Sequence, residues 1–262
     1  MNRIVGRWGW WLLAGTPLLA FLTIPVATLI FKAIGNRTAA SPEFAQAVSL
    51  SFQTSLASIA LIVVFGTPLA FAVARFRFPG YRVVNALIDL PVVFPPAAAG
   101  IALLLAFGRN GLIPTSFGFT SVAVVMAQSF VASPFYVRAA INSFTKTDLE
   151  TEESASLEGA GPIRVFGWII LPQSGPQLVS GAVTSWARAL GEFGATILFA
   201  GNLVGKTQTM PLAIYIGWET DLDQAITLSA IMLGAAFVAI VAVRLLTERQ
   251  TPTSKYRKAE KP

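Results

Sequence analysis

The residues with the clearest potential for chemistry are Arg188 and Glu192, two ionisable side chains within an otherwise apolar stretch. They are four positions apart, which places them on one face of a helix and within reach of an ion pair. Ionisable groups inside an apolar span usually face a bundle interior or a water-filled path. The pair therefore predicts either the lining of a polar route or a structural ion pair that fixes helix packing, and both interpretations stay open.

Catalytic chemistry is disfavoured by the residues that the chain lacks. It contains no His and no Cys, so the commonest general base and the thiolate nucleophile are both missing. The string AGNLVGKT, residues 200–207, approximates a phosphate-binding P-loop, but a true P-loop lies between a strand and a helix. Here the string lies between two apolar segments. We expect no catalytic residue, no metal site and no cofactor in this chain.

The composition is that of an integral membrane protein. Of the 262 residues, 54% are hydrophobic and 12% are charged, with a mean hydropathy of +0.65. Soluble domains carry about twice that charged fraction. The formal charge of +6 could suggest nucleic acid, but the basic residues lie at the ends of apolar runs rather than on one soluble face. We therefore expect a lipid environment and no nucleic-acid partner.

Six apolar segments are long enough to cross a hydrocarbon core of about 30 Å, which takes about 20 helical residues. They run near residues 8–31, 49–74, 84–107, 121–142, 173–200 and 225–246. The predicted fold is an all-α integral membrane bundle of six transmembrane helices over residues 1–246. A basic, Pro-containing tail follows at 247–262, and we expect it to be disordered.

The positions of Lys and Arg predict how the bundle is oriented. Fourteen of the 19 basic residues lie on one side of the six segments, four lie on the other, and Arg188 lies within the fifth segment. Cytoplasmic loops are enriched in Lys and Arg. Both termini are therefore predicted to be cytoplasmic, as is the long loop at about residues 143–172.

Two of the predicted spans contain residues that interrupt a helix or allow close contact between helices. The third span carries Pro95 and Pro96, which remove helical hydrogen bonds, and irregular backbone at membrane depth is tolerated only where protein or water satisfies it. The fifth span carries Gly191 and Gly194 among rows of small residues that allow close helix contact. With Arg188 and Glu192, these residues are candidates for a translocation pathway or for packing.

The long loop contains the signals of a short surface helix. Thr147 and Glu150 form a capping box that predicts a helix start at Thr147. Gly159, Gly161 and Pro162 predict its end at Gly159 and the start of a second helix that leads into Pro172. Five acidic residues make the loop a local acidic island. It is either a docking helix for a partner or a solvated surface helix.

The stretch ESASLEGAGPIRVFGWIILP, residues 153–172, resembles the EAA motif, the signature loop of ABC-importer permeases. The matching positions are Glu153, Ser154, Ala155, Gly159, Ile169, Leu171 and Pro172, and Ser154 is the one departure, a small residue in place of Ala. In that family this loop is the coupling helix, which fits into a cleft of a cytoplasmic ATPase subunit. The resemblance implies that coupling to the ATPase rests on Glu153, Ser154, Ala155, Leu157, Gly159, Ala160 and Gly161.

Three further strings resemble the molybdate and sulfate branch of these permeases, and the molybdate permeases more. They are LPVVFPPAAAGIALLLAFG (residues 90–108), ARALGEFGAT (187–196) and KTQTMPLAIYIGWETDLDQAITLS (206–229). The resemblance implies a permease homodimer in the inner membrane that imports molybdate or tungstate, with sulfate as the alternative. It also implies a dimer of ATPase subunits that bind ATP and Mg, and an extracytoplasmic oxyanion-binding protein.

An ATP-independent secondary transporter is a different class that the sequence leaves open. Such a carrier is expected to contain an internal repeat and intramembrane acids for ion coupling. The chain has no convincing repeat, and the acid well inside a span, Glu192, has Arg188 beside it. A membrane-embedded enzyme is disfavoured further, because the spans carry no His, no Cys and no pair of carboxylates.

Overall fold

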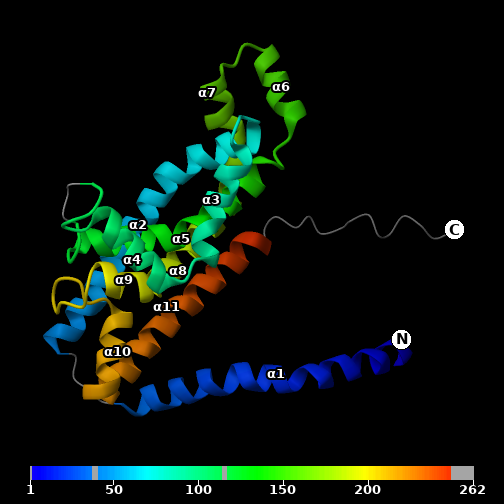
Figure 1. The fold of residues 1–262 in the computed structure, drawn as a ribbon. Coiled ribbons are helices and arrows are strands. Elements are labelled where there is room, and N and C mark those ends of the chain that lie inside the picture. Colours follow the sequence, from blue (N-terminus) through cyan, green and yellow to red (C-terminus); the bar gives the residue numbers. More distant parts are fainter. Residues whose placement is uncertain (1, 37–40, 114–116, 249–262) are drawn as a thin grey trace.

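The computed structural model describes the backbone of residues 2–36, 41–113 and 117–248, and the side chains of 14–36, 41–113 and 117–245. These residues form helices and loops, with no strand among them. The elements in chain order (Figure 1) are α1 (Asn2–Gly35), α2 (Pro42–Arg75), α3 (Tyr81–Val93), α4 (Pro96–Phe107), α5 (Ser121–Phe144), α6 (Leu149–Leu157), α7 (Pro162–Val165), the π-helical turn η1 (Phe166–Ile170), α8 (Leu171–Leu190), α9 (Gly194–Phe199), α10 (Met210–Thr220) and α11 (Leu222–Glu248). The all-α prediction is confirmed.

Four helical stretches among the described residues are long and apolar enough to cross a membrane, namely Ala14–Gly35, α2, α5 and Leu222–Leu245. The chain bends by 118° between α3 and α4, which form either one broken span, and so a fifth crossing, or a re-entrant loop. The predicted number of six is therefore not confirmed. The predicted third span is bent sharply before Pro96, and the predicted fifth is divided into α8 and the short α9 by a break at 191–193.

The core of the bundle lies where α5 packs between α2 and α8. Small side chains allow the close contact: Ser58 of α2 and Ser185 of α8 each donate a hydrogen bond to a carbonyl of α5, at 3.1 and 2.7 Å. Tyr136 and Phe144 of α5 are buried in the same core. By contrast, α1 packs mainly against α11 and extends away from the bundle (Figure 1). The packed core of the fold is therefore centred on α5.

The helices α6 and α7 protrude from one end of the bundle, close to the end of α2 (Figure 1). The predicted N-cap of α6, Thr147, is one residue too early. Asp148 is the N-cap, and its Oδ1 accepts the Glu150 N–H at 3.1 Å. The Thr147 hydroxyl instead donates to the Phe144 carbonyl at 3.0 Å. The prediction of a second helix after Gly161 is confirmed. Pro162 is the first residue of α7, and helical structure continues through η1 into α8.

The end of α6 follows the prediction closely. Gly159 has φ +93°, a left-handed conformation that favours glycine. Its N–H donates to the Ser156 carbonyl at 3.1 Å, and the Ala160 N–H donates to the Ala155 carbonyl at 2.9 Å. These two bonds form a Schellman motif, which satisfies the last carbonyls of the helix. The chain therefore reverses sharply at Gly159, and α7 lies next to α6.

Candidate functional site

Arg188 and Glu192 form the ion pair that their spacing predicts. The Arg188 Nη1 lies 3.0 Å from the Glu192 Oε2, and the Glu192 side chain is 1% exposed whereas that of Arg188 is 32% exposed. The other carboxylate oxygen, Oε1, accepts the backbone N–H of Ala195 at 2.8 Å. Both oxygens of this buried carboxylate are therefore satisfied, as a buried charge requires.

Glu192 also determines where α9 begins. The chain leaves α8 after Leu190, and Phe193 has non-helical angles of φ −127° and ψ −54°. The first N–H groups of a helix have no partner within it, and a carboxylate at that end satisfies one of them and interacts favourably with the helix dipole. Glu192 thus caps α9 while it holds a cation of α8, so one side chain bridges the break.

The two interrupted spans meet at their breaks. A Cβ atom placed on Gly194 would lie 2.8 Å from the Cβ of Pro96, and one placed on Gly100 would lie 2.8 Å from the Ala195 carbonyl oxygen. No side chain fits at either distance, so the glycines are what allow α9 to lie directly on α4. The structure therefore brings Pro96, at the start of α4, together with Gly194, at the start of α9.

Of the remaining pathway candidates, Pro95 is the N-cap residue of α4 and is exposed. Gly191 is the C-cap residue of α8, and a Cβ there would meet its nearest atom at an ordinary 3.7 Å. Of the two break glycines, Gly194 is thus the one required by packing. The six predicted pathway residues all belong to two adjacent helix breaks, although they are far apart in sequence.

A second polar cluster, which the sequence analysis did not assign, joins α3 to α5. Arg138 of α5 donates from Nε and Nη2 to the two carboxylate oxygens of Asp89, both at 2.6 Å. Its Nη1 and Nη2 also reach the side-chain oxygen and the carbonyl of Asn85 at 2.8 and 2.9 Å. Such a bidentate pair fixes direction as well as distance. Asn85 and Asp89 are one helical turn apart, and this spacing predicts that their side chains lie on the same face of a helix.

The predicted coupling residues lie together on the protruding end. Glu153, Ser154, Leu157, Gly159 and Gly161 are exposed, whereas Ala155 and Ala160 are partly buried and pack against the core around α5. Leu157 is 90% exposed, and Ile163 of α7 is 87% exposed. These two large apolar side chains are exposed outside the helices that are long enough to cross a membrane.

The helix α6 is tied to the bundle by an ion pair that sequence spacing could not reveal. Arg75, the last residue of α2, pairs with Glu152, and it also donates to the Thr147 hydroxyl. The side chains of Arg75 and Glu152 are each 15% exposed, so the pair is shielded from water more than a surface pair is. The pair therefore links α6 to the end of α2.

The family model described as binding-protein-dependent transport system inner membrane component matches residues 62–252. The molybdenum transport system permease protein ModB of Mycobacterium tuberculosis is 38% identical over 245 residues, 90% of this chain and 93% of that protein. The protein named "probable transport system permease protein NifC" of Clostridium pasteurianum is 38% identical over 235 residues, 86% of this chain and 82% of that protein. The sulfate transport system permease protein CysW of Synechococcus elongatus is 32% identical over 216 residues, 79% of this chain and 74% of that protein.

Solved structures share the fold at low sequence identity. A chain of a bacterial ABC transporter that imports the acidic polysaccharide alginate matches with a TM-score of 0.72 and 15% identity, over 96% of this chain and 100% of that one. A chain of the inward-facing MetNI methionine ABC transporter matches with a TM-score of 0.58 and 17% identity, over 78% and 93%. The sequence matches and this shared fold agree: the chain belongs to the family of inner membrane components of binding-protein-dependent transport systems, the ABC permeases.

Proposed function

We propose that this chain is the membrane-spanning permease subunit of an ATP-driven importer of molybdate or tungstate. The observation that carries the proposal is the 38% identity to a molybdenum permease over 93% of that protein's length. Sulfate is the second candidate, favoured by the match to a sulfate permease at 32% identity. The three ions are tetrahedral dianions, so a passage that admits one of them presents suitable charge and shape to the others.

The partners follow from this assignment. The proposal includes a second copy of this chain, a dimer of cytoplasmic ATPase subunits that bind ATP and Mg, and an extracytoplasmic oxyanion-binding protein, with both termini of this chain in the cytoplasm. The alginate importer supports the last of these partners, since it is also known in complex with its periplasmic protein. ATP hydrolysis is assigned to the partner. The P-loop-like string in this chain is followed by a helix only at Met210, which is unlike a P-loop.

The exposed surface of α6 is the proposed contact with the ATPase. Glu153 offers a charge, Leu157 offers a large apolar side chain, and Gly159 to Gly161 give the reversal that exposes both. Closure of the ATPase dimer would move α6, and the Arg75–Glu152 pair would carry that motion into α2. ATP binding then shifts the equilibrium between two arrangements of the spans because it favours one of them, with no chemistry in this chain.

The meeting of the two helix breaks is the proposed moving part of the pathway. Arg188 is partly exposed and Glu192 is buried, so a passing dianion could approach the cation while the carboxylate remains shielded behind it. The alternative, that the pair only stabilises the break, predicts a loss of folding stability without a change in ion preference.

The test is reconstitution of this chain in lipid bilayers with its ATPase subunit and binding protein. Uptake and ATPase activity are measured with molybdate, tungstate or sulfate, and the matched control omits the ATPase subunit. The proposal expects stimulation by molybdate and tungstate in the full assembly and no uptake in the control. Stimulation by sulfate alone would assign the second candidate, and uptake without the ATPase would replace the proposal with a secondary carrier.

A further inference from the structure

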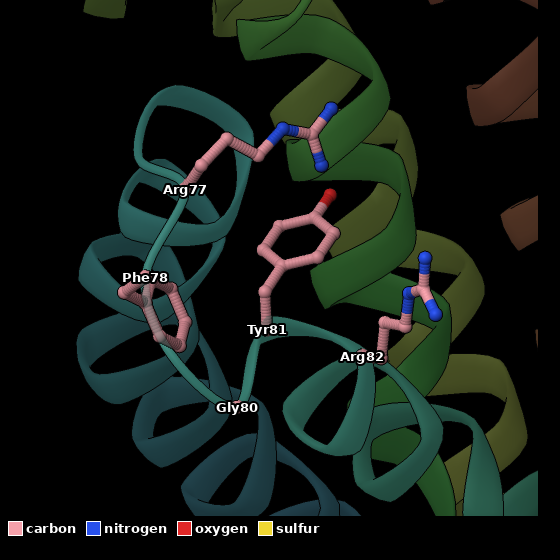
Figure 2. A pocket seen from close by; sticks show the side chains of 5 residues that line it. All are labelled: Arg77, Phe78, Gly80, Tyr81 and Arg82. Atoms are coloured by element: carbon pink, nitrogen blue, oxygen red, sulfur yellow. The ribbon is translucent and has the colours of Figure 1, made fainter.

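A basic pocket lies at the elbow that joins α2 to α3. It has a volume of about 490 Å³ and is lined by Arg77, Phe78, Gly80, Tyr81 and Arg82 (Figure 2). The chain can turn here because Gly80 adopts φ +87°, and α3 begins at the next residue. Figure 2 shows Arg77 reaching toward the pocket from the segment before this turn, and Tyr81 and Arg82 rising from the first turn of α3.

The pocket carries positive charge that the described residues do not neutralise. The Arg77 guanidinium carbon lies 4.3 Å from the centre of the Tyr81 ring, a cation–π contact that holds the side chain in place without removing its charge. Among the described side chains neither Arg77 nor Arg82 has a carboxylate partner, whereas nearby Arg75 is paired with Glu152. The first turn of α3 contains no acidic residue either.

The surroundings of the pocket are apolar and lie at the end of a membrane span. The helix α2 is one of the apolar helices long enough to cross the bilayer, and it ends at Arg75, immediately before the elbow. Val83 and Leu87 lie on one face of α3 and are 61% and 58% exposed, and Phe76 at the elbow is 58% exposed. A cationic pocket with an apolar surface beside it, at the depth where a span ends, matches a lipid that has a charged headgroup and acyl chains.

We propose that this elbow pocket binds the phosphate of an anionic phospholipid headgroup. Arg77 and Arg82 contact the phosphate, and the acyl chains lie along the exposed face of α3. An acidic segment of a protein would satisfy the two arginines but would leave the apolar face of α3 uncovered, so the lipid explains more of the surface. A lipid held there would brace the α2–α3 connection. The inference goes beyond the importer assignment and does not depend on it.

The experiment measures how many lipids the purified full-length chain retains, by native mass spectrometry after titration with phosphatidylglycerol or with phosphatidylcholine of the same acyl chains. Both lipids carry a phosphate, but phosphatidylglycerol has a net negative charge. We expect phosphatidylglycerol to be retained in preference. The variants Arg77→Gln and Arg82→Gln should each weaken its binding about fivefold, the effect of removing one basic residue near an anionic lipid.

Arg109→Gln is the matched control, because Arg109 is an exposed arginine outside the pocket, and it should leave retention unchanged. Arg77→Lys with Arg82→Lys keeps the charge and should retain most of the binding. Thermal unfolding of each variant verifies that it is folded, and the comparison of the two lipids on the unchanged chain needs no variant.

Lipid retention by the unchanged chain and by the double variant R77Q/R82Q tests the proposed lipid site. Equal retention of the two lipids by the unchanged chain, or equal retention of phosphatidylglycerol by the R77Q/R82Q chain, would overturn it. Displacement of phosphatidylglycerol by millimolar inorganic phosphate would assign the pocket to a free anion instead. In a second measurement, on the chain purified together with the ATPase subunit, loss of that subunit from R77Q/R82Q with unchanged lipid retention would assign the pocket to a protein partner.

Discussion

The Glu192 carboxylate accepts the backbone N–H of Ala195 at 2.8 Å, so one buried side chain connects α8 across the break to α9. The same carboxylate is neutralised by Arg188. Because α9 lies directly on α4, whatever holds Glu192 in place also holds the contact between the two broken spans.

Removing either member of this pair should destabilise the fold. Arg188→Ala leaves a buried carboxylate without its cation, and we expect a loss of roughly 1–3 kcal/mol in the free energy of unfolding, less than for a fully buried pair because Arg188 is partly exposed. The double variant R188A/E192A should cost less than the sum of the two single variants. Denaturant unfolding in detergent measures all three. Strictly additive losses would show that the two side chains act separately.

Glu192→Gln separates the two roles of this side chain. The amide oxygen can still accept the Ala195 N–H, but the ion pair with Arg188 is lost. We therefore expect Glu192→Gln to be less destabilising than Glu192→Ala, by about 1 kcal/mol, the net value of the retained hydrogen bond. Equal losses in the two variants would mean that the cap of α9 contributes nothing to stability.

The contact between α9 and α4 should tolerate no added methyl group. Gly194→Ala places a Cβ at 2.8 Å from the Pro96 Cβ, which forces α9 away from α4 at a cost of about 1–3 kcal/mol. Gly191→Ala is the matched control, because its Cβ meets nothing closer than 3.7 Å. We expect Gly194→Ala to abolish uptake in the reconstituted importer and Gly191→Ala to retain it. Equal uptake by both variants would contradict the close contact.

The proposed docking role of α6 predicts that a charge reversal on it uncouples the importer. Glu153 is exposed, and its side chain makes no hydrogen bond or ion pair with any other residue in the described part of the chain. Glu153→Lys should therefore leave thermal stability within about 0.5 kcal/mol while it lowers oxyanion-stimulated ATPase activity severalfold. Glu150→Lys makes the same charge change on the same helix outside the motif. Normal stimulation with Glu153→Lys, or the same loss in both variants, would refute the assignment.

The Arg75–Glu152 pair is expected to determine how firmly α6 is held. Arg75→Gln and Glu152→Gln each leave one charge in a shielded position, and a double-mutant cycle should give a coupling of about 1–2 kcal/mol. Limited proteolysis after residue 146 should be faster in each single variant, because α6 loses its connection to α2. Unchanged proteolysis would show that the Schellman turn and η1 hold α6 without this pair.

Local rules explain most of what could be anticipated from the sequence. The stop of α6 at Gly159 follows from the left-handed conformation that glycine allows, and the Arg188–Glu192 pair follows from helical spacing. One error arose where two neighbouring residues are both N-cap types: the Asp148 carboxylate accepts the Glu150 N–H, whereas the Thr147 hydroxyl donates to the Phe144 carbonyl. The predicted disorder of the tail concerns residues that lie almost entirely outside the described part, which ends at Glu248.

By itself the sequence determined the all-α membrane character, the end of α6 and the family, because length, hydropathy, capping and spacing each depend on neighbouring residues. The tertiary structure decided that Pro96 contacts Gly194 and that two ion pairs form, Arg75 with Glu152 and Arg138 with Asp89. These partners lie tens of residues apart in the chain, and they meet because the packing of α2, α5 and α8 sets where each helix ends in space. No residue pattern along the chain carries that information.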